Sequence, residues 1–183
     1  LVSTDAIRQI MRLMLSKALA PAIHASSYDA WRHLPDLAGS EDPVIEGFRA
    51  MATTVSVGVR ALLDRAVAEN ASLILDGVSL VPGLLDLKSF ADRAHVIFLI
   101  VATLDAESFG DRFAQRARTE VARGPHRYLE NLDAILRVAR QEAEEHVVTA
   151  AAQGEADVGR VMEARVFIEA DKAARGNRGA RRN

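Results

Sequence analysis

Apolar residues recur at a helical spacing near the start of the chain, directly after a short polar run. They lie at i, i+3, i+4 and i+7 and comprise Ile7, Ile10, Met11 and Met14. The polar run Ser3–Asp5 contains residue types that favour the first positions of a helix. We therefore expect a helix here with this apolar stripe buried, preceded by the end of a strand and broken at Pro21.

A second, longer helix is predicted from Pro43 to about Glu69. Proline suits the first turn of a helix, and apolar residues follow it at a helical spacing. The predicted buried positions are Ile45, Phe48, Met51, Val55, Val59, Leu62 and Leu63. The stretch before this helix is rich in Ser, Asp, Gly and Pro, and it predicts a loop-rich excursion around Tyr28 and Trp31.

Two short, continuous apolar runs predict buried strands. The first, Ser72–Leu75, ends at Asp76 and Gly77, and the second spans His95–Val101. Runs of this length are typical of strands covered on both faces in the middle of a parallel sheet. Because these strands alternate with helices, the pattern predicts an α/β fold with a parallel sheet.

The remaining pattern is helical, with one weaker strand signal. We expect a helix capped by Asp105, a hinge at Gly124 and Pro125, and a helix from about Tyr128 to Glu145. The apolar residues between 146 and 149 predict a last strand, and residues 158–174 predict a terminal helix.

Length and composition fit one globular domain. The chain has 183 residues, of which 49% are hydrophobic and 26% charged, so we assign residues 1–174 to a domain and 175–183 to a basic flexible tail. A net charge of -2 and the lack of any apolar run of about 18 residues predict no nucleic-acid or membrane partner. The absence of cysteine suits the cytoplasm. We expect a small-molecule partner and leave a homodimer open.

Three groups of residues could carry chemistry. The first is Ser3–Asp5 with Arg8, where hydroxyls, a carboxylate and helix amides meet at the end of a strand and a cation lies one turn further on. These residues could hold an anionic ligand. Simple capping of a helix explains Ser3–Asp5 as well, and spacing alone favours this alternative.

The second group directly follows the first buried strand. Asp76 could hold a magnesium ion there, and Gly77 and Gly83 would let the backbone approach phosphates closely. A tight turn capped by Asp76 is an equally good explanation.

The third group is a set of arginines with one histidine. Phosphoryl transfer depends on cations that neutralise the moving group, and arginines on a closing segment suit this task. The set comprises Arg112, Arg116, Arg118, Arg123, His126 and Arg127. Solvated helix charges paired with neighbouring carboxylates remain the alternative.

Five segments together carry a resemblance to a known family. They are Val2–Arg8 (VSTDAIR), His24–Trp31 (HASSYDAW), Pro43–Phe48 (PVIEGF), Leu75–Gly83 (LDGVSLVPG) and Arg123–Leu129 (RGPHRYL). In this order and spacing the chain resembles the 2-phosphoglycerate kinase family over roughly residues 1–145. The resemblance implies a three-layer P-loop sandwich with a parallel sheet, and transfer of the ATP γ-phosphoryl group to the hydroxyl of 2-phosphoglycerate.

The resemblance also implies roles for individual residues, with ATP and Mg²⁺ as cofactors. Asp5 would orient or deprotonate the acceptor hydroxyl, Asp76 would help to hold magnesium, and Arg116 and Arg118 would meet the transferred phosphate. Gly77 and Gly83 would lie near the nucleotide. The implied acceptor-binding residues are Ser3, Thr4, Arg8, Tyr28, Trp31, Arg123, His126 and Arg127.

Two departures from the family pattern stand out. The phosphate-binding signature Gly-x-x-x-x-Gly-Lys-Ser/Thr is absent, and we expect it within about 50 residues before Leu1, a distance set by one strand, one loop and one helix. Without this loop and its strand, the sheet would lack its N-terminal part. Ser79 also stands where the family pattern leads us to expect histidine.

A non-catalytic remnant is the alternative from a different functional class. Such a protein would bind an anionic metabolite or a protein partner through Arg8 and the arginine segment, without ATP. Binding of 2-phosphoglycerate in the absence of ATP binding would favour it.

Overall fold

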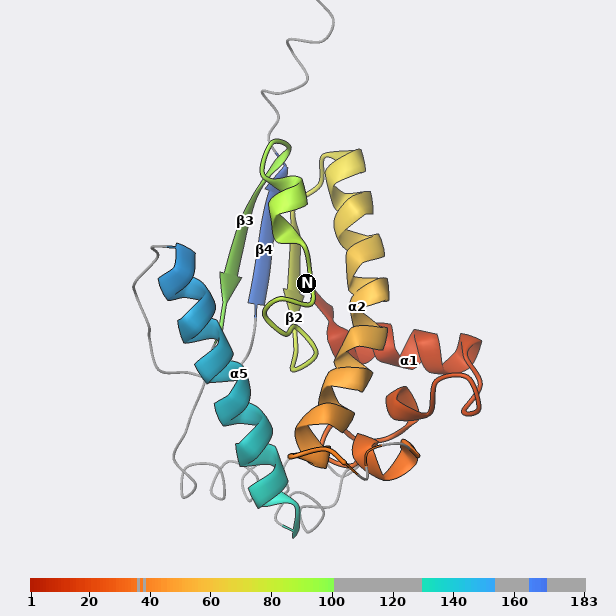
Figure 1. The fold of residues 1–183 in the computed structure, drawn as a ribbon. Helices are drawn as coiled ribbons and strands as arrows, with labels where there is room; N and C mark the ends of the chain where they lie inside the picture. The colour runs from red at the N-terminus through yellow and green to blue at the C-terminus, as the bar shows by residue number, and fades with distance from the viewer. Residues whose placement is uncertain (36, 38, 101–129, 154–164, 171–183) are drawn as a thin grey trace, which may run out of the picture.

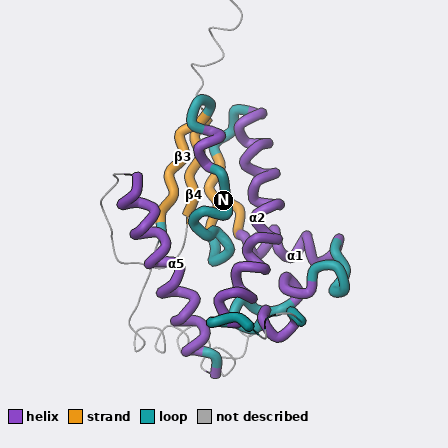
Figure 2. The backbone as a smooth tube through the Cα atoms, viewed as in Figure 1, coloured by secondary structure: helices purple, strands orange, loops and turns teal. Residues whose placement is uncertain are grey.

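The computed structural model describes residues 1–35, 37, 39–100, 130–153 and 165–170, with side chains described as far as residue 142. These residues contain both helices and strands (Figure 2). The strands are β1 (Val2–Ser3), β2 (Leu73–Asp76), β3 (Ala94–Leu99) and β4 (Arg165–Ala170). The helices are α1 (Thr4–Met14), α2 (Pro43–Glu69) and α5 (Leu132–Gln153), with short 3-10 turns η1 (Pro21–His24), η2 (Ala30–His33) and η3 (Leu87–Phe90).

The described strands form one sheet in the order β1-β2-β4-β3. β1 pairs with β2 in parallel, whereas β4 runs antiparallel to both β2 and β3. The fold is therefore mixed α/β, and the predicted parallel pairing is present between β1 and β2 but not in the rest of the described sheet. Since β4 lies at residues 165–170, the terminal helix predicted over 158–174 was wrong there too. The β-branched and aromatic residues Val166, Phe167 and Ile168 favour a strand.

β3 lies at the edge of the described sheet rather than in its middle. Its residues alternate between buried and exposed positions, and Ile97 and Leu99 are 54% and 46% exposed. The expectation that both faces of this strand are covered was therefore wrong. An edge strand with one face open leaves every second side chain in contact with solvent.

Helix α2 supplies most of the core, as its apolar spacing predicts. Phe48, Met51, Val55 and Val59 recur on one side of the helix and are 2% exposed or less. The helix starts where Asp42 caps it, because the Oδ1 atom accepts hydrogen bonds from the amides of residues 44 and 45 at 3.0 and 3.3 Å.

Helix α1 turns a different face inward from the one predicted. Ile7 is buried, but Ile10 and Met14 are 60% and 78% exposed, so the prediction that these two residues belong to the buried stripe was wrong. The inward positions follow Thr4 at helical spacing and include Arg8 and Arg12. Position 4 decides the face because it is fixed against the turn that follows β2.

Helix α5 confirms the helix predicted from about residue 128 to 145 and continues beyond it. Residues 146–149 lie within α5, so the strand predicted there was wrong. Arg137 of this helix pairs with Asp42, and Figure 1 shows α2 and α5 beginning at the same end of the molecule. The pair therefore connects the first turn of α2 to α5.

β2 and β3 point toward the end of the molecule where α2 and α5 begin (Figure 1). β1 ends beside β2, so the start of α1 lies next to the turn after β2. Among the described helices, none combines the length and the apolar character that crossing a membrane requires. The helix predicted after Asp105, the hinge at residues 124 and 125 and the tail 175–183 lie outside the described residues.

Candidate active site

Two segments meet at the carboxyl ends of β1 and β2. They are the start of α1 and the turn that follows β2. Ser3 is opposite Asp76 in the parallel register, so the residues that follow these strands lie side by side. Ser3 also caps α1, because its Oγ atom accepts a hydrogen bond from the amide of Asp5 at 3.1 Å. Its hydroxyl therefore has the structural role that the capping alternative predicts.

Thr4 and Asp76 present buried oxygen atoms at this rim. Thr4 is 1% exposed, and within the described part of the chain neither its Oγ1 atom nor the Oδ1 atom of Asp76 has a hydrogen-bond partner. Buried polar atoms without partners cost free energy, and they are therefore common where a ligand or ion completes the site. Thr4 and Asp76 consequently form the center of the candidate site.

Gly77 allows these two turns to approach each other. A Cβ atom at this position would lie 2.0 Å from Thr4 Oγ1, and the φ angle of Gly77 is 131°, a value that other residues rarely adopt. Ser79, two residues further on, is 3% exposed. Gly83 also has a positive φ, of 82°, but faces open space. Gly77 thus adjoins the site, whereas a Cβ atom at position 83 would meet no described atom within 4 Å.

Asp5 and Arg8 form an ion pair next to this rim. Arg8 Nη2 lies 2.9 Å from Asp5 Oδ1, and the two side chains are 14% and 51% exposed. Arg8 Nη1 also donates to the sulfur of Met51 at 3.2 Å and to the carbonyl oxygen of Ala25 at 3.5 Å. The guanidinium group therefore reaches inward between α1 and α2, while the carboxylate remains accessible.

The excursion between α1 and α2 packs against α2. Tyr28 is 5% exposed, and the Trp31 backbone lies so close to Gly47 that a Cβ atom there would come within 2.2 Å of the Trp31 amide nitrogen. His24 Nε2 lies 2.9 Å from the carbonyl oxygen of Leu15, which holds the excursion to the end of α1. The excursion therefore borders the inward face of α1, where Arg8 lies.

Arg12 is a nearby cation that sequence analysis did not single out. Its Nη2 atom donates to the same Ala25 carbonyl oxygen that Arg8 contacts, also at 3.5 Å. The signal in the sequence was the i, i+4, i+8 spacing of Thr4, Arg8 and Arg12, which places them on one helix face. The predicted contributions of Arg116, Arg118, Arg123, His126 and Arg127, like Arg112, fall outside the described residues.

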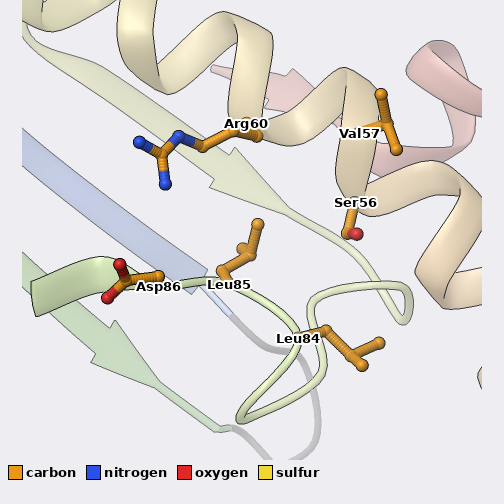
Figure 3. A pocket seen from close by; sticks show the side chains of 6 residues that line it. All are labelled: Ser56, Val57, Arg60, Leu84, Leu85 and Asp86. Atoms are coloured by element: carbon orange, nitrogen blue, oxygen red, sulfur yellow. The ribbon is translucent and has the colours of Figure 1, made fainter. Parts of the chain in front are cut away.

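A separate hollow of about 360 Å³ lies between the middle of α2 and the loop before η3 (Figure 3). Its lining comprises Ser56, Val57, Arg60, Leu84, Leu85 and Asp86. The Arg60 side chain pairs with Asp64 at 3.0 Å and lies 4.5 Å from the center of the Phe90 ring. Because this cation already has partners and none of the predicted site residues lines the hollow, we place the site at Thr4 and Asp76.

The sequence is similar to several curated archaeal proteins named 2-phosphoglycerate kinase. The relative from Methanopyrus kandleri is 36% identical over 149 residues, which cover 79% of this chain and 45% of the relative. The relative from Methanothermobacter thermautotrophicus is 36% identical over 146 residues, covering 76% of this chain and 46% of the relative. The relative from Methanocaldococcus jannaschii is 37% identical over 128 residues, covering 70% and 40%.

These relatives are named as kinases of a small molecule, and the mixed α/β fold of this chain is compatible with that class of protein. The chain belongs to the 2-phosphoglycerate kinase family, which confirms the resemblance found in its five segments. It spans a little under half the length of these curated relatives. No family model matches the chain, and no solved structure matches it.

Proposed function

We propose that this chain contributes the acceptor side and the magnesium-binding rim of an ATP-dependent phosphotransferase. The enzyme would move the γ-phosphoryl group of ATP to the hydroxyl of 2-phosphoglycerate or a similar small phosphorylated hydroxy acid. The observation that carries the proposal is the pair of buried oxygens, Thr4 Oγ1 and Asp76 Oδ1, where two parallel strands end. The names of the archaeal relatives support the same reaction.

The oxygens at the rim fit a magnesium ion. Mg²⁺ prefers carboxylate and other oxygen ligands, and at phosphate sites it takes one or two carboxylates and keeps waters and phosphate oxygens in its other positions. Asp76 would supply the carboxylate and Thr4 a hydroxyl. The described residues contain no cluster of three or more histidine or acidic groups, so a site with a single carboxylate is the arrangement we propose. When bound, magnesium would neutralise charge on the phosphates.

Asp5 and Arg8 would act on the acceptor. An anionic group of the acceptor would replace Asp5 as the partner of Arg8, and the exposed Asp5 carboxylate would then be available to the acceptor hydroxyl. There it would orient the hydroxyl and accept its proton. The ion pair between them would thus keep both side chains in position before the acceptor binds.

The arginine segment would complete the charge balance around the transferred group. Arg116 and Arg118 would neutralise the phosphoryl oxygens, while Arg123, His126 and Arg127 would bind the acceptor or close over it. The glycine-lysine loop that binds ATP phosphates is not among the 183 residues, so the proposal requires another segment to supply it.

The proposal is tested by ³¹P NMR with the protein expressed from its complete reading frame. After incubation with ATP, Mg²⁺ and 2-phosphoglycerate, we expect ADP and a second phosphate ester resonance on the acceptor. Glycerate and 3-phosphoglycerate test which acceptor is used. Formation of ADP with no phosphorylated acceptor would indicate a hydrolase and would contradict the proposal.

A further inference from the structure

Helix α1 has one side covered by α2 and one side open to solvent. A Cβ atom at Gly58 of α2 would lie 2.6 Å from Ile7 Cγ2 and 3.3 Å from the Met11 sulfur, so these two side chains contact α2. On the other side of α1, three large apolar side chains are exposed. They are Ile10, Leu13 and Met14, at 60%, 81% and 78%.

The open side of α1 is continuous. Ala6, Ile10, Leu13 and Met14 follow the spacing i, i+4, i+7 and i+8, so they line the same side of the helix. Leu19, in the turn after α1, is 78% exposed as well. Figure 1 shows α1 at the side of the molecule opposite α5. Monomeric proteins rarely leave a contiguous apolar patch in water, so this side of α1 has the character of an interaction surface.

The exposed charges near this surface lie at its two ends. Asp5, in the first turn of α1, is 51% exposed, and the exposed Lys17 follows the end of the helix. Between them the sequence has only two other charged residues, Arg8 and Arg12, and both donate to the Ala25 carbonyl oxygen on the covered side. The middle of the open side is therefore uncharged, and its ends carry opposite charges.

A second copy of α1 complements this surface. In an antiparallel pair around a two-fold axis, the apolar residues of one copy pack against the same residues of the other. Lys17 of each copy then lies near the first turn of the other, where Asp5 is exposed. A parallel pair would instead bring like charges together. A lipid surface fits less well, because the open side offers one cation and the chain has a net charge of -2.

We propose that two copies of this chain associate through the open side of α1, as an antiparallel pair centred between Ile10 and Leu13. This contact is independent of the reaction proposed above. A standard interface has about 20 to 30 residues a side, and the open side of α1 has far fewer. The association is therefore weak and depends on protein concentration.

Analytical ultracentrifugation of the 183-residue chain tests this contact, at concentrations from about 10 μM to about 1 mM. We expect a shift from monomer to dimer over this range. Leu13→Gln keeps a good helix former but removes apolar surface, and the two-fold axis applies the change twice. It should raise the dissociation constant by about 10-fold or more. A chain that stays monomeric throughout would overturn the inference.

Two further variants test the surface and the orientation. Val57→Gln makes the same kind of change at a position of α2 that is 67% exposed and lines the separate hollow, so it should leave the association unchanged. Lys17→Glu would place like charges near each other in the antiparallel pair. It should weaken the dimer at low salt and have less effect at about 1 M salt. Equal effects of Leu13→Gln and Val57→Gln would show that the open side of α1 is not the interface.

The remaining occupants of this surface give different results. The protein from the complete reading frame should also dimerise, and Leu13→Gln should weaken that dimer. If that protein is monomeric, or if Leu13→Gln leaves its dimer intact, other residues cover the open side and the inference fails. Binding of the monomer to phosphatidylglycerol vesicles that Leu13→Gln abolishes, without any dimer, would assign the surface to a membrane instead.

Discussion

At the scale of single residues, the site depends on a close contact between two turns. Gly77 lets the turn after β2 reach Thr4, and the same contact places Asp76 beside the start of α1. A side chain at position 77 would have to displace the Thr4 hydroxyl. The geometry of the candidate site therefore depends on the absence of one Cβ atom.

Gly77→Ala should lower the free energy of unfolding by about 3 kcal/mol or more, because it combines a strained φ with the overlap against Thr4. Gly83→Ala is the matched control, since it also has a positive φ but meets no atom within 4 Å. It should cost about 1 to 2 kcal/mol. Urea denaturation of both variants measures the difference, and equal losses would show that the Thr4 contact contributes nothing.

Glu142 on α5 is a buried carboxyl group, 8% exposed, and burial raises its pKa well above the usual value of 4.5. At pH below 4.5 the group is protonated in both the folded and the unfolded protein, so its burial costs the folded state little free energy at that pH. As the pH rises, the unfolded chain ionises first and the folded state loses relative stability until Glu142 itself ionises.

Glu142→Gln should therefore raise the melting temperature at pH 7, and this gain should disappear as the pH falls toward 4.5. Melting curves of both proteins from pH 4 to pH 7 test the expectation. Glu130→Gln, at an exposed position before α5, is the control and should give no pH-dependent gain. A gain for Glu142→Gln that is the same at every pH would rule out ionisation as its cause.

At the scale of elements, Asp42 links two helices. One carboxylate oxygen caps α2 and the other accepts from Arg137 of α5. Asp42→Ala should lower the free energy of unfolding by about 1 to 2 kcal/mol, mostly through the lost cap. Glu41→Ala removes the same charge from the neighbouring exposed residue and should change stability by less than about 0.5 kcal/mol. Chemical denaturation distinguishes the two, and equal effects would indicate only a change in net charge.

Sequence patterns predicted the elements whose signals are local. The apolar spacing and the Asp42-Pro43 start predicted α2 correctly, and the apolar run before Asp76 predicted β2. The pattern of α1 did not determine which face turns inward, because Met11 belongs both to the predicted apolar stripe and to the face that carries Arg8. That choice depends on Thr4 meeting Gly77, a contact between residues more than 70 positions apart.

The sequence pattern also could not predict the direction in which β4 pairs with its neighbours. β4 pairs with β2 and β3 through backbone hydrogen bonds, and both parallel and antiparallel pairing satisfy them. For the site, the sequence indicated Asp76, Thr4 and Arg8, because each follows a strand end or a capping position. It did not indicate Arg12, because an arginine in a helix is usually solvated. Only the inward orientation of this face of α1 brings Arg12 to the Ala25 carbonyl oxygen that Arg8 also contacts.

At the scale of the whole molecule, the described residues form a mixed α/β unit in which the start of α1 meets the turn after β2. The rim with Thr4 and Asp76 lies at one end of the stripe formed by Thr4, Arg8 and Arg12, and the excursion around Tyr28 borders that stripe. The archaeal relatives are about twice as long as the matched region.

The most direct test of this account is the rate of phosphoryl transfer from ATP to 2-phosphoglycerate in the protein from the complete reading frame, with Asp76 intact and with Asp76→Asn. Asparagine keeps the size of the side chain but removes the charge that would hold magnesium. We predict a fall in rate of about 100-fold or more, with the fold retained by circular dichroism. A variant that transfers phosphate at the wild-type rate would show that the rim of β1 and β2 is not the catalytic site.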